Sequence, residues 1–363
     1  MKLSSFIGGL PRTLAAIGLL TGTPGIVLAR DTAKPHQTQQ KNAVAQALAQ
    51  LQSRDEHLQS IGWKLITANA AFCPHPRMAI GLLLQDVAAF AKPDAVRAAM
   101  GLSGDIAVQA VAAGSPTQFA GLPVHAEILA IDDEKMADLT PAGKKVWRRS
   151  VGLHQQINAS LAATGSVTIV WQSSAQTPVK TIITGVPACS SRFEMIAGSR
   201  RASANGSRVA IGERFAGFTY SEEMFAAAIA HELAHNFLRH PAWLDANGRR
   251  QRNIRATERE ADRLMGWLLA NAGYDPAAGE RFMRHWGPGH DGGILRARTH
   301  EGWDERAENI AAELPLIQQA IARDGKADWP RYFIRDIRPL NPAPAPPSSP
   351  VPAPVPEPEP EPE

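Results

Sequence analysis

The apolar positions of the chain recur at helical spacing most clearly in two successive segments between residues 222 and 272. The first segment carries an apolar stripe made of Phe225, Ala228, Ile229 and Leu233. Ser221 stands before it as an N-cap, two glutamates follow in the first turn, and Pro241 closes the segment. This pattern predicts a helix between Ser221 and Pro241.

The second segment runs from Thr257 to Ala272 and predicts another helix. Its apolar face is made of Ala261, Leu264, Met265, Leu268 and Ala272. Gly273 follows as the C-terminal stop, because glycine readily adopts the left-handed conformation that ends many helices.

The pattern before residue 200 is different. Residues 37–71 predict a mostly helical lead-in, which we expect to pack on the domain that holds the two helices above; its apolar positions are Val44, Leu48, Leu51 and Leu58. Apolar runs at 107–111, 128–132, 167–171 and 179–184 predict strands, and residues 150–163 predict a helix among them.

The amino terminus predicts export. Lys2 and Arg12 precede an apolar stretch from Leu14 to Ala29, which is short for a bilayer span and is interrupted by glycine and proline. We therefore expect a cleavable signal peptide at 1–29, with an uncleaved anchor as the alternative. No cysteine follows the small residues, so a lipoprotein anchor is not indicated. The expected location is periplasmic or otherwise extracytoplasmic, with no transmembrane span after signal removal.

Two cysteines, Cys73 and Cys189, occur in the 363 residues. In an exported protein such a pair predicts a disulfide, which in the chain-entropy model would stabilise the fold by roughly 4–5 kcal/mol before strain is subtracted. Two buried free thiols are the alternative.

Charge and composition limit the classes of molecule that the protein is expected to bind. The formal net charge is +3, and nucleic-acid binding is not expected. Five arginines (Arg249, Arg250, Arg252, Arg255 and Arg259) cluster between the two predicted helices, where a solvated loop or a contact with substrate or anionic lipid would account for them. Eleven of the 28 prolines fall in the last 23 residues, which predicts an extended tail, either a spacer or a solvated terminus.

The first helix carries the candidate chemistry, His231-Glu232-Leu233-Ala234-His235. The i, i+4 spacing puts two imidazoles on one helical face, where both can bind a zinc ion. Glu232 lies beside them and can take a proton from a water that the metal activates. A helix with two merely hydrogen-bonded histidines is the alternative. It would hold two imidazoles and a carboxylate without compensation in a protein core.

The third ligand must come from elsewhere. Pro241 occupies the position of the third histidine of metzincins, and Leu238 that of their turn glycine, which excludes this class. His240 is one residue out of register and is expected to be a surface or capping histidine. On the second helix, Glu258 and Asp262 stand at i, i+4.

Two carboxylates at this spacing repel each other unless a cation is near. We assign Glu258 as third ligand and Asp262 as acceptor for the outer N–H of a ligand histidine, with Glu260 pointing away. Salt bridges from Glu258 or Asp262 to a nearby arginine (Arg255, Arg259 or Arg263) are the alternative.

The pattern His231-Glu232-Leu233-Ala234-His235 followed by Glu258-Arg259-Glu260-Ala261-Asp262 resembles the HExxH plus ExxAD signature of the HtpX and CAAX-prenyl-endopeptidase family, and its soluble exported branch in particular. The likeness covers about residues 203–314. It implies one zinc ion per chain held by His231, His235 and Glu258, with Glu232 as general base and peptide bonds as substrate.

The same resemblance points to a loop near the metal. In the exported branch a Thr-His-Pro segment precedes a helix that contains an arginine. Here Thr299-His300 precedes the helix-forming residues 303–306, and Glu301 replaces the proline. His300 is therefore a candidate for covering the metal, and Arg306 a candidate near the oxyanion.

The β-rich segment resembles a bacterial PDZ domain, on the strand at 107–111, the turn and short helix at 114–122 and the strand at 128–132. Ala126-Glu127 stands where that family usually has Gly-Asp. The resemblance implies that residues 80–83 form the loop that binds a terminal carboxylate, with protein C-termini as ligands. The alternative is a rigid spacer or a lid. His154, on the presumed ligand-binding helix, is expected to be solvated.

The sequence thus predicts an α+β protein, with a β-rich PDZ-like domain before a mainly helical zincin-type metallopeptidase domain. The expected boundaries are a signal peptide at 1–29, a helical segment at 30–73, the PDZ-like domain at 74–188, the metallopeptidase domain at 189–330 and a disordered Pro/Glu-rich tail at 331–363. The expected function is proteolysis of envelope proteins, with protein or peptide substrates. A PDZ-based binding or chaperone-like protein with an autoinhibited zinc site is the first alternative, and a zinc hydrolase of cell-wall peptide is another.

Overall fold

The computed structural model describes residues 33–140, 143, 147–289 and 302–340. Residues 1–40 and residues 41–363 form two units, and the description below concerns the second. The expected signal peptide at 1–29 lies outside the described residues. Helices and antiparallel sheets occur together, which confirms the α+β class.

The helices and strands have the following bounds. The helices are α1 (Ala33–Ala68), α2 (Pro93–Met100), α3 (Pro116–Phe119), α4 (Trp147–Thr164), α5 (Glu222–Phe237), α6 (His240–Asn247), α7 (Gln251–Asn271), α8 (Ala278–Trp286), α9 (Trp303–Asp324) and α10 (Trp329–Tyr332). The strands are β1 (Arg77–Ala79), β2 (Leu82–Asp86), β3 (Ile106–Val111), β4 (Glu127–Ile131), β5 (Glu134–Lys135), β6 (Ser166–Gln172), β7 (Pro178–Thr184), β8 (Val186–Ala188), β9 (Arg192–Ile196), β10 (Ala202–Ala204) and β11 (Arg208–Gly212).

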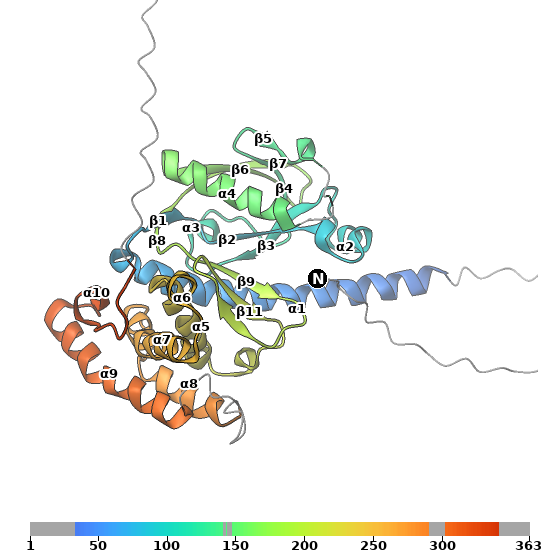
Figure 1. Cartoon of the computed structure of the whole chain (residues 1–363). Coiled ribbons are helices and arrows are strands. Elements are labelled where there is room, and N and C mark those ends of the chain that lie inside the picture. The colour runs from blue at the N-terminus through green and yellow to red at the C-terminus, as the bar shows by residue number, and fades with distance from the viewer. Residues whose placement is uncertain (1–32, 141–142, 144–146, 290–301, 341–363) are drawn as a thin grey trace, which may run out of the picture. The chain divides into compact units, whose positions relative to one another are not determined.

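A six-stranded sheet forms the β-rich part, in the order β2-β3-β4-β6-β7 with β5 paired to β4 (Figure 1). Alternate residues of β6, such as Val167 and Ile169, are buried because side chains alternate between the two faces of a strand. Leu153, Ile157 and Leu161 of α4 pack in the same core. The predicted strands and the predicted helix at 150–163 are thereby confirmed, each within three residues.

The β-rich part begins and ends at one place. β1 pairs antiparallel with β8, with Arg77 opposite Ala188. Just outside this pair, Cys73 and Cys189 form a disulfide with Cα atoms 5.6 Å apart and a sequence separation of 116. The predicted disulfide is therefore confirmed, and it closes the β-rich part as a loop of the chain.

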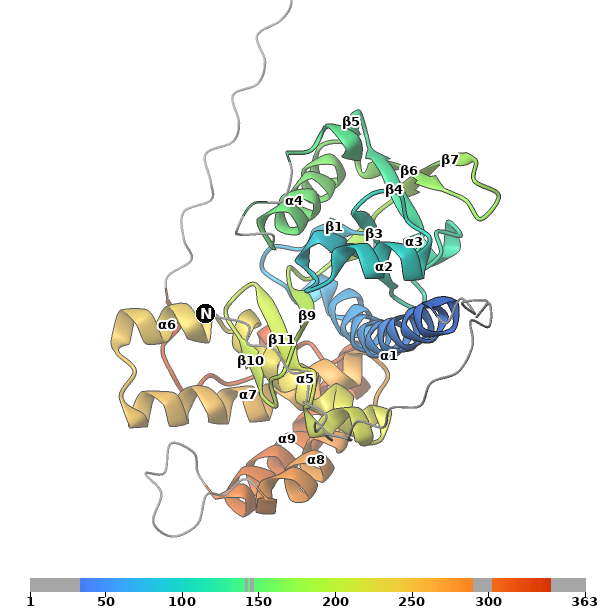
Figure 2. The same cartoon turned by 90° about the vertical axis from the view of Figure 1, so that its right-hand side faces the viewer.

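The helical part is built around α5 (Figure 2), whose residues Phe225–Ala230 are buried. α7, α8 and α9 pack with it in one apolar core, together with the small sheet of β10, β11 and β9. None of the helices that the structure describes has the length and apolar character required to cross a membrane.

Helix α1 packs on the helical part, where the sequence led us to expect it, and also on the β-rich part. Leu58 and Leu65 lie in the core of the helical part. Leu48 instead packs with Val87 and Val96 of the β-rich part. The reason is the length of the helix, which exceeds what one core can cover.

Removal of the disulfide is expected to destabilise the protein without removing a catalytic group. The Cys73→Ala/Cys189→Ala variant should lose roughly 4–5 kcal/mol of unfolding free energy, because its unfolded chain is no longer closed into a long loop. Urea unfolding of the variant beside oxidised wild type measures this loss. An unchanged midpoint would show that the cross-link carries no stability.

The burial of Asp55 of α1 predicts that the stability of the protein depends on pH. Its carboxylate accepts from Gln109 Nε2 at 2.7 Å, and burial raises its pKa from 3.8 to about 6 although this hydrogen bond opposes the shift. The folded form therefore holds the proton more tightly than the unfolded form, so this contribution to stability is full below pH 3.8 and is lost as pH rises through 6.

Asp55→Asn should remove this loss. The difference in unfolding free energy between the variant and wild type should change by on the order of 2 kcal/mol in favour of the variant when the pH rises from 4 to 7. Urea titrations at both pH values provide the test, with Asp133→Asn as an exposed control. Parallel pH profiles for Asp55→Asn and wild type would contradict the assignment.

Candidate metal centre

Helix α5 positions the two histidines. Ser221 accepts a hydrogen bond from the Met224 N–H at 3.4 Å, which caps the helix where the sequence predicted it. The helix ends at Phe237, and Arg239 then adopts a left-handed conformation with φ 58° before α6 starts. Two short helices at an angle thus replace a longer one, and α6 begins with His240 and Pro241.

Helix α7 faces α5 and lies beside it (Figures 1 and 2). It begins at Gln251, six residues before the predicted start at Thr257, so Arg252 and Arg255 belong to a helix and not to the expected loop. The additional turn is a solvated stretch without the apolar periodicity on which the prediction relied. Its later residues are buried, and Gly273 follows its end with φ 72°.

The contact between α5 and α7 brings His231, His235 and Glu258 together. The two Nε2 atoms of the histidines lie 3.3 Å apart. Glu258 Oε2 lies 3.5 Å from His231 Nε2, and Glu258 Oε1 lies 3.5 Å from His235 Nε2. Among the described residues, these three form a group whose ligand atoms are all within 4.8 Å of one another.

These distances fit a zinc ion. Ligand atoms at 2.0–2.1 Å from a tetrahedral zinc are separated by roughly 3.3–3.4 Å. In the structure the two Nε2 atoms lie 3.3 Å apart, and each lies 3.5 Å from a different oxygen of the Glu258 carboxylate, which is close to that value. The two nitrogens and the carboxylate are also a ligand set that zinc accepts.

Asp262 holds the outer side of His231. Its Oδ1 lies 3.0 Å from His231 Nδ1, and its side chain is buried. Arg306 of α9 pairs with the same carboxylate through Nε–Oδ2 at 2.6 Å and Nη2–Oδ1 at 2.8 Å. Arg306 Nη2 also lies 3.7 Å from Glu258 Oε2. Arg306 therefore contacts both acidic residues of the site.

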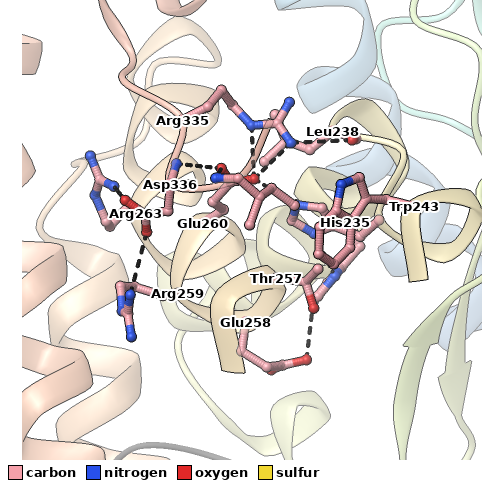
Figure 3. Close-up of polar contacts among 12 residues, drawn as sticks. His235, Leu238, Trp243, Thr257, Glu258, Arg259, Glu260, Arg263, Arg335 and Asp336 are labelled. Carbon is pink, nitrogen blue, oxygen red and sulfur yellow. Dashed lines mark hydrogen bonds and ion pairs between the residues drawn. The ribbon is translucent and has the colours of Figure 1, made fainter. Parts of the chain in front are cut away.

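Two of the three arginines that we considered as alternative partners of Glu258 and Asp262 pair with other acidic residues. Arg263 pairs with Glu313 at 2.6 Å and with Asp336 at 2.8 Å, and Arg259 lies 3.8 Å from Asp336 (Figure 3).

His240 is fully buried, whereas the sequence led us to expect a surface or capping position. The turn at Arg239 brings the His240 ring back toward α5, so that its Nδ1 lies 2.9 Å from His235 Nδ1. Its Nε2 lies 3.0 Å from Glu260 Oε2. Glu260 does point away from Glu258 and Asp262, but it reaches His235 through His240.

Glu260 is itself surrounded by donors from the end of the described chain (Figure 3). Arg335 donates through Nε to its Oε2 at 2.8 Å, and the Asp336 and Ile337 N–H groups donate to Oε1 at 2.6 and 2.9 Å. Burial raises the pKa of Glu260, but the hydrogen bonds from His240, Arg335 and Ile337 outweigh it and lower the pKa to about 2. Glu260 is therefore ionised at neutral pH.

Electrostatics separate the two histidines of the motif. Burial opposes protonation of His231, yet Asp262 and Glu258 raise its pKa to about 10. His235 is buried without comparable support, and its pKa falls to about 3. A cation held between them would take the place of the proton that the acidic residues otherwise attract to His231.

Glu232 lies next to this group on α5. Burial raises its pKa to about 7, with His231 and Arg306 acting in the opposite direction and Glu258 adding to the rise. A carboxylate whose pKa is near 7 can both accept and return a proton at neutral pH.

The structure thus brings together Glu232, His231, His235, Glu258, Asp262 and Arg306. His300 lies outside the described residues. From the sequence we placed His240 at the surface or at a cap, gave Glu260 no role in the site, and did not name Arg335. His240 had one signal, its place as the next histidine after the motif, but the turn that directs it inward could not be read from periodicity. Arg335 is 75 residues from Glu260 and carries no local signal.

No family model, curated protein or solved structure matches this chain significantly.

Replacement of Glu258 by glutamine should abolish stoichiometric metal binding, because it removes the anionic ligand while keeping the size of the side chain. After dialysis against a zinc buffer, elemental analysis should find about one zinc per wild-type chain and far less in Glu258→Gln. Glu308→Gln, an exposed change on α9, is the control and should retain zinc. Equal zinc in both variants would remove Glu258 from the ligand set.

Proposed function

We propose that this protein is an exported zinc-dependent endopeptidase. The observation that carries the proposal is the arrangement of His231, His235 and Glu258, whose separations of 3.3–3.5 Å suit one tetrahedral zinc ion. The resemblance of both helices to the HExxH plus ExxAD signature supports the same assignment. The disulfide is in keeping with an extracytoplasmic location.

The residues of the chain divide the work as follows. Zinc, when bound, supplies Lewis acidity that makes water a nucleophile at neutral pH and polarises the peptide carbonyl. Glu232 accepts the proton of the attacking water and passes it to the leaving amine, for which a pKa of about 7 is suited. Asp262 orients His231 from its outer side, and Arg306 holds Asp262 in place.

The PDZ-like part bears on regulation in this proposal. A PDZ domain binds its ligand as an added strand beside the edge of its sheet. β2 is an end strand of the sheet, but its Leu84 N–H lies 3.3 Å from Nε2 of His154 on α4. Arg149 of α4 also binds Asp86 of β2 at 2.6 and 2.7 Å.

A peptide that adds to β2 at Leu84 therefore has to displace His154, which the sequence led us to expect in solvent. His154 is instead buried enough that its pKa falls to about 4, so it is neutral and can accept the Leu84 N–H. We therefore favour a role of the PDZ-like part in regulation or as a spacer over a role in permanent binding of the C-termini of substrate proteins. The PDZ-based binding function remains the second candidate, supported by the position of β2 at the end of the sheet.

Glu232→Gln should leave zinc binding intact and lower cleavage of an unfolded protein such as casein by roughly 100- to 10,000-fold. Fluorescence release from labelled casein measures the rate, and a chelator should reduce wild type to the same level. Glu223→Gln, a change at a half-buried residue of the same helix that pairs with Arg281, is the matched control and should cleave like wild type. If Glu232→Gln and wild type cut casein equally, the peptidase assignment is wrong.

The two alternative functions give different results in the same assay. A binding or chaperone-like protein would hold casein in solution without cutting it, with or without Glu232. A cell-wall hydrolase would leave casein intact and cut a cell-wall peptide in a manner that depends on Glu232.

A further inference from the structure

Residues Phe333–Leu340, which we call the C-terminal strap, follow α10 and lie outside the part of the chain that resembles a peptidase. Phe333 is buried in the main core. Asp336 pairs with Arg263 of α7 at 2.8 Å, and the Arg338 carbonyl accepts from Trp243 Nε1 of α6 at 3.0 Å. The strap is thus tied to both α6 and α7, although the sequence placed residues 331–340 in a disordered tail. The rest of that tail, 341–363, lies outside the described residues.

The strap supplies three of the groups that hold Glu260. Arg335 lies 2.7 Å from Oε2 through Nη2 and 2.8 Å through Nε. The two successive N–H groups of Asp336 and Ile337 both donate to Oε1. Backbone N–H groups and a guanidinium can only donate, so this environment suits a carboxylate anion that only accepts.

A fixed direction of hydrogen bonding follows from that anion. Glu260 can only accept, so Nε2 of His240 must donate to it across 3.0 Å. In a neutral imidazole the other nitrogen then carries a lone pair, so His240 Nδ1 accepts from Nδ1–H of His235 across 2.9 Å. His235 is left with its lone pair on Nε2, the atom that lies beside His231 and Glu258.

We propose that the C-terminal strap is a positioning element of the metal centre, acting through Glu260 and His240 to fix the tautomer and orientation of His235. The inference rests on the zinc site proposed above. Groups that hold the outer nitrogen of a metal-binding histidine contribute strongly to metal affinity. On the other side of the site, Asp262 holds His231 directly. For His235 the chain uses a longer connection that starts 75 residues after Glu260.

The test is metal affinity of the full chain, measured by competition for zinc with a chromophoric chelator. His240→Phe should raise the zinc Kd roughly 10- to 100-fold, because it removes the acceptor for His235 Nδ1–H. Arg335→Met should raise the Kd in the same direction by less, since two backbone N–H groups still hold Glu260, and Arg335→Lys should recover part of the loss. Arg338→Met, the same change on an exposed strap residue, should match wild type.

Two further measurements separate positioning from a general loss of structure. The absorption bands of the cobalt(II)-substituted protein should shift in His240→Phe and Arg335→Met and stay unchanged in Arg338→Met. In the double variant His240→Phe/Arg335→Met the two effects on Kd should not add, because the arginine acts through the histidine.

The outcomes distinguish this inference from the function on which it rests. Wild type that binds no zinc would overturn the proposed metal centre, and this inference with it. Wild type that binds zinc while Arg335→Met behaves like Arg338→Met, or additive effects in the double variant, would overturn the role of the strap alone.

Discussion

The packing of α5 against α7 is the contact on which the rest of the candidate site depends. Each helix alone carries an incomplete set of groups, two imidazoles on one and a carboxylate on the other. Their contact closes the three separations to 3.3–3.5 Å. The apolar residues between them, such as Leu233 and Leu264, are fully buried and hold the helices in register. The polar groups are thus placed by a hydrophobic interface that continues beneath them.

Buried charge in the helical part is arranged in two neighbouring pairs. Asp262 pairs with Arg306, and Glu260 pairs with Arg335. The two acids lie two residues apart on α7, and each contacts a histidine of the group. A buried ion pair contributes little net stability, but loss of one partner typically costs about 3–5 kcal/mol. Such pairs can therefore fix the positions of their side chains while changing the net stability of the fold only slightly. The two arginines come from α9 and from the strap, both of which follow α7 in the sequence.

The sequence specified local features well and distant ones poorly. Ser221, the motif spacing and Gly273 are local signals, and the helices they predict lie where expected. The i, i+4 spacing of Glu258 and Asp262 made both residues candidates, and the structure places both beside the histidines. His154, His240 and Arg335 were misjudged or missed, because their partners lie 70, 5 and 75 residues away across turns that periodicity does not encode. Leu48 shows the same limit, since one helical stripe gave no indication that α1 packs in two cores.

The disulfide between Cys73 and Cys189 has a consequence for how this architecture can change. The chain enters and leaves the β-rich part at two cysteines whose Cα atoms lie 5.6 Å apart. This part is therefore an insertion whose two ends are joined by a disulfide. Its content can lengthen, shrink or be exchanged during evolution while α1 still runs on into β9. Substitutions within residues 74–188 can therefore accumulate without moving the points at which the chain enters and leaves this part.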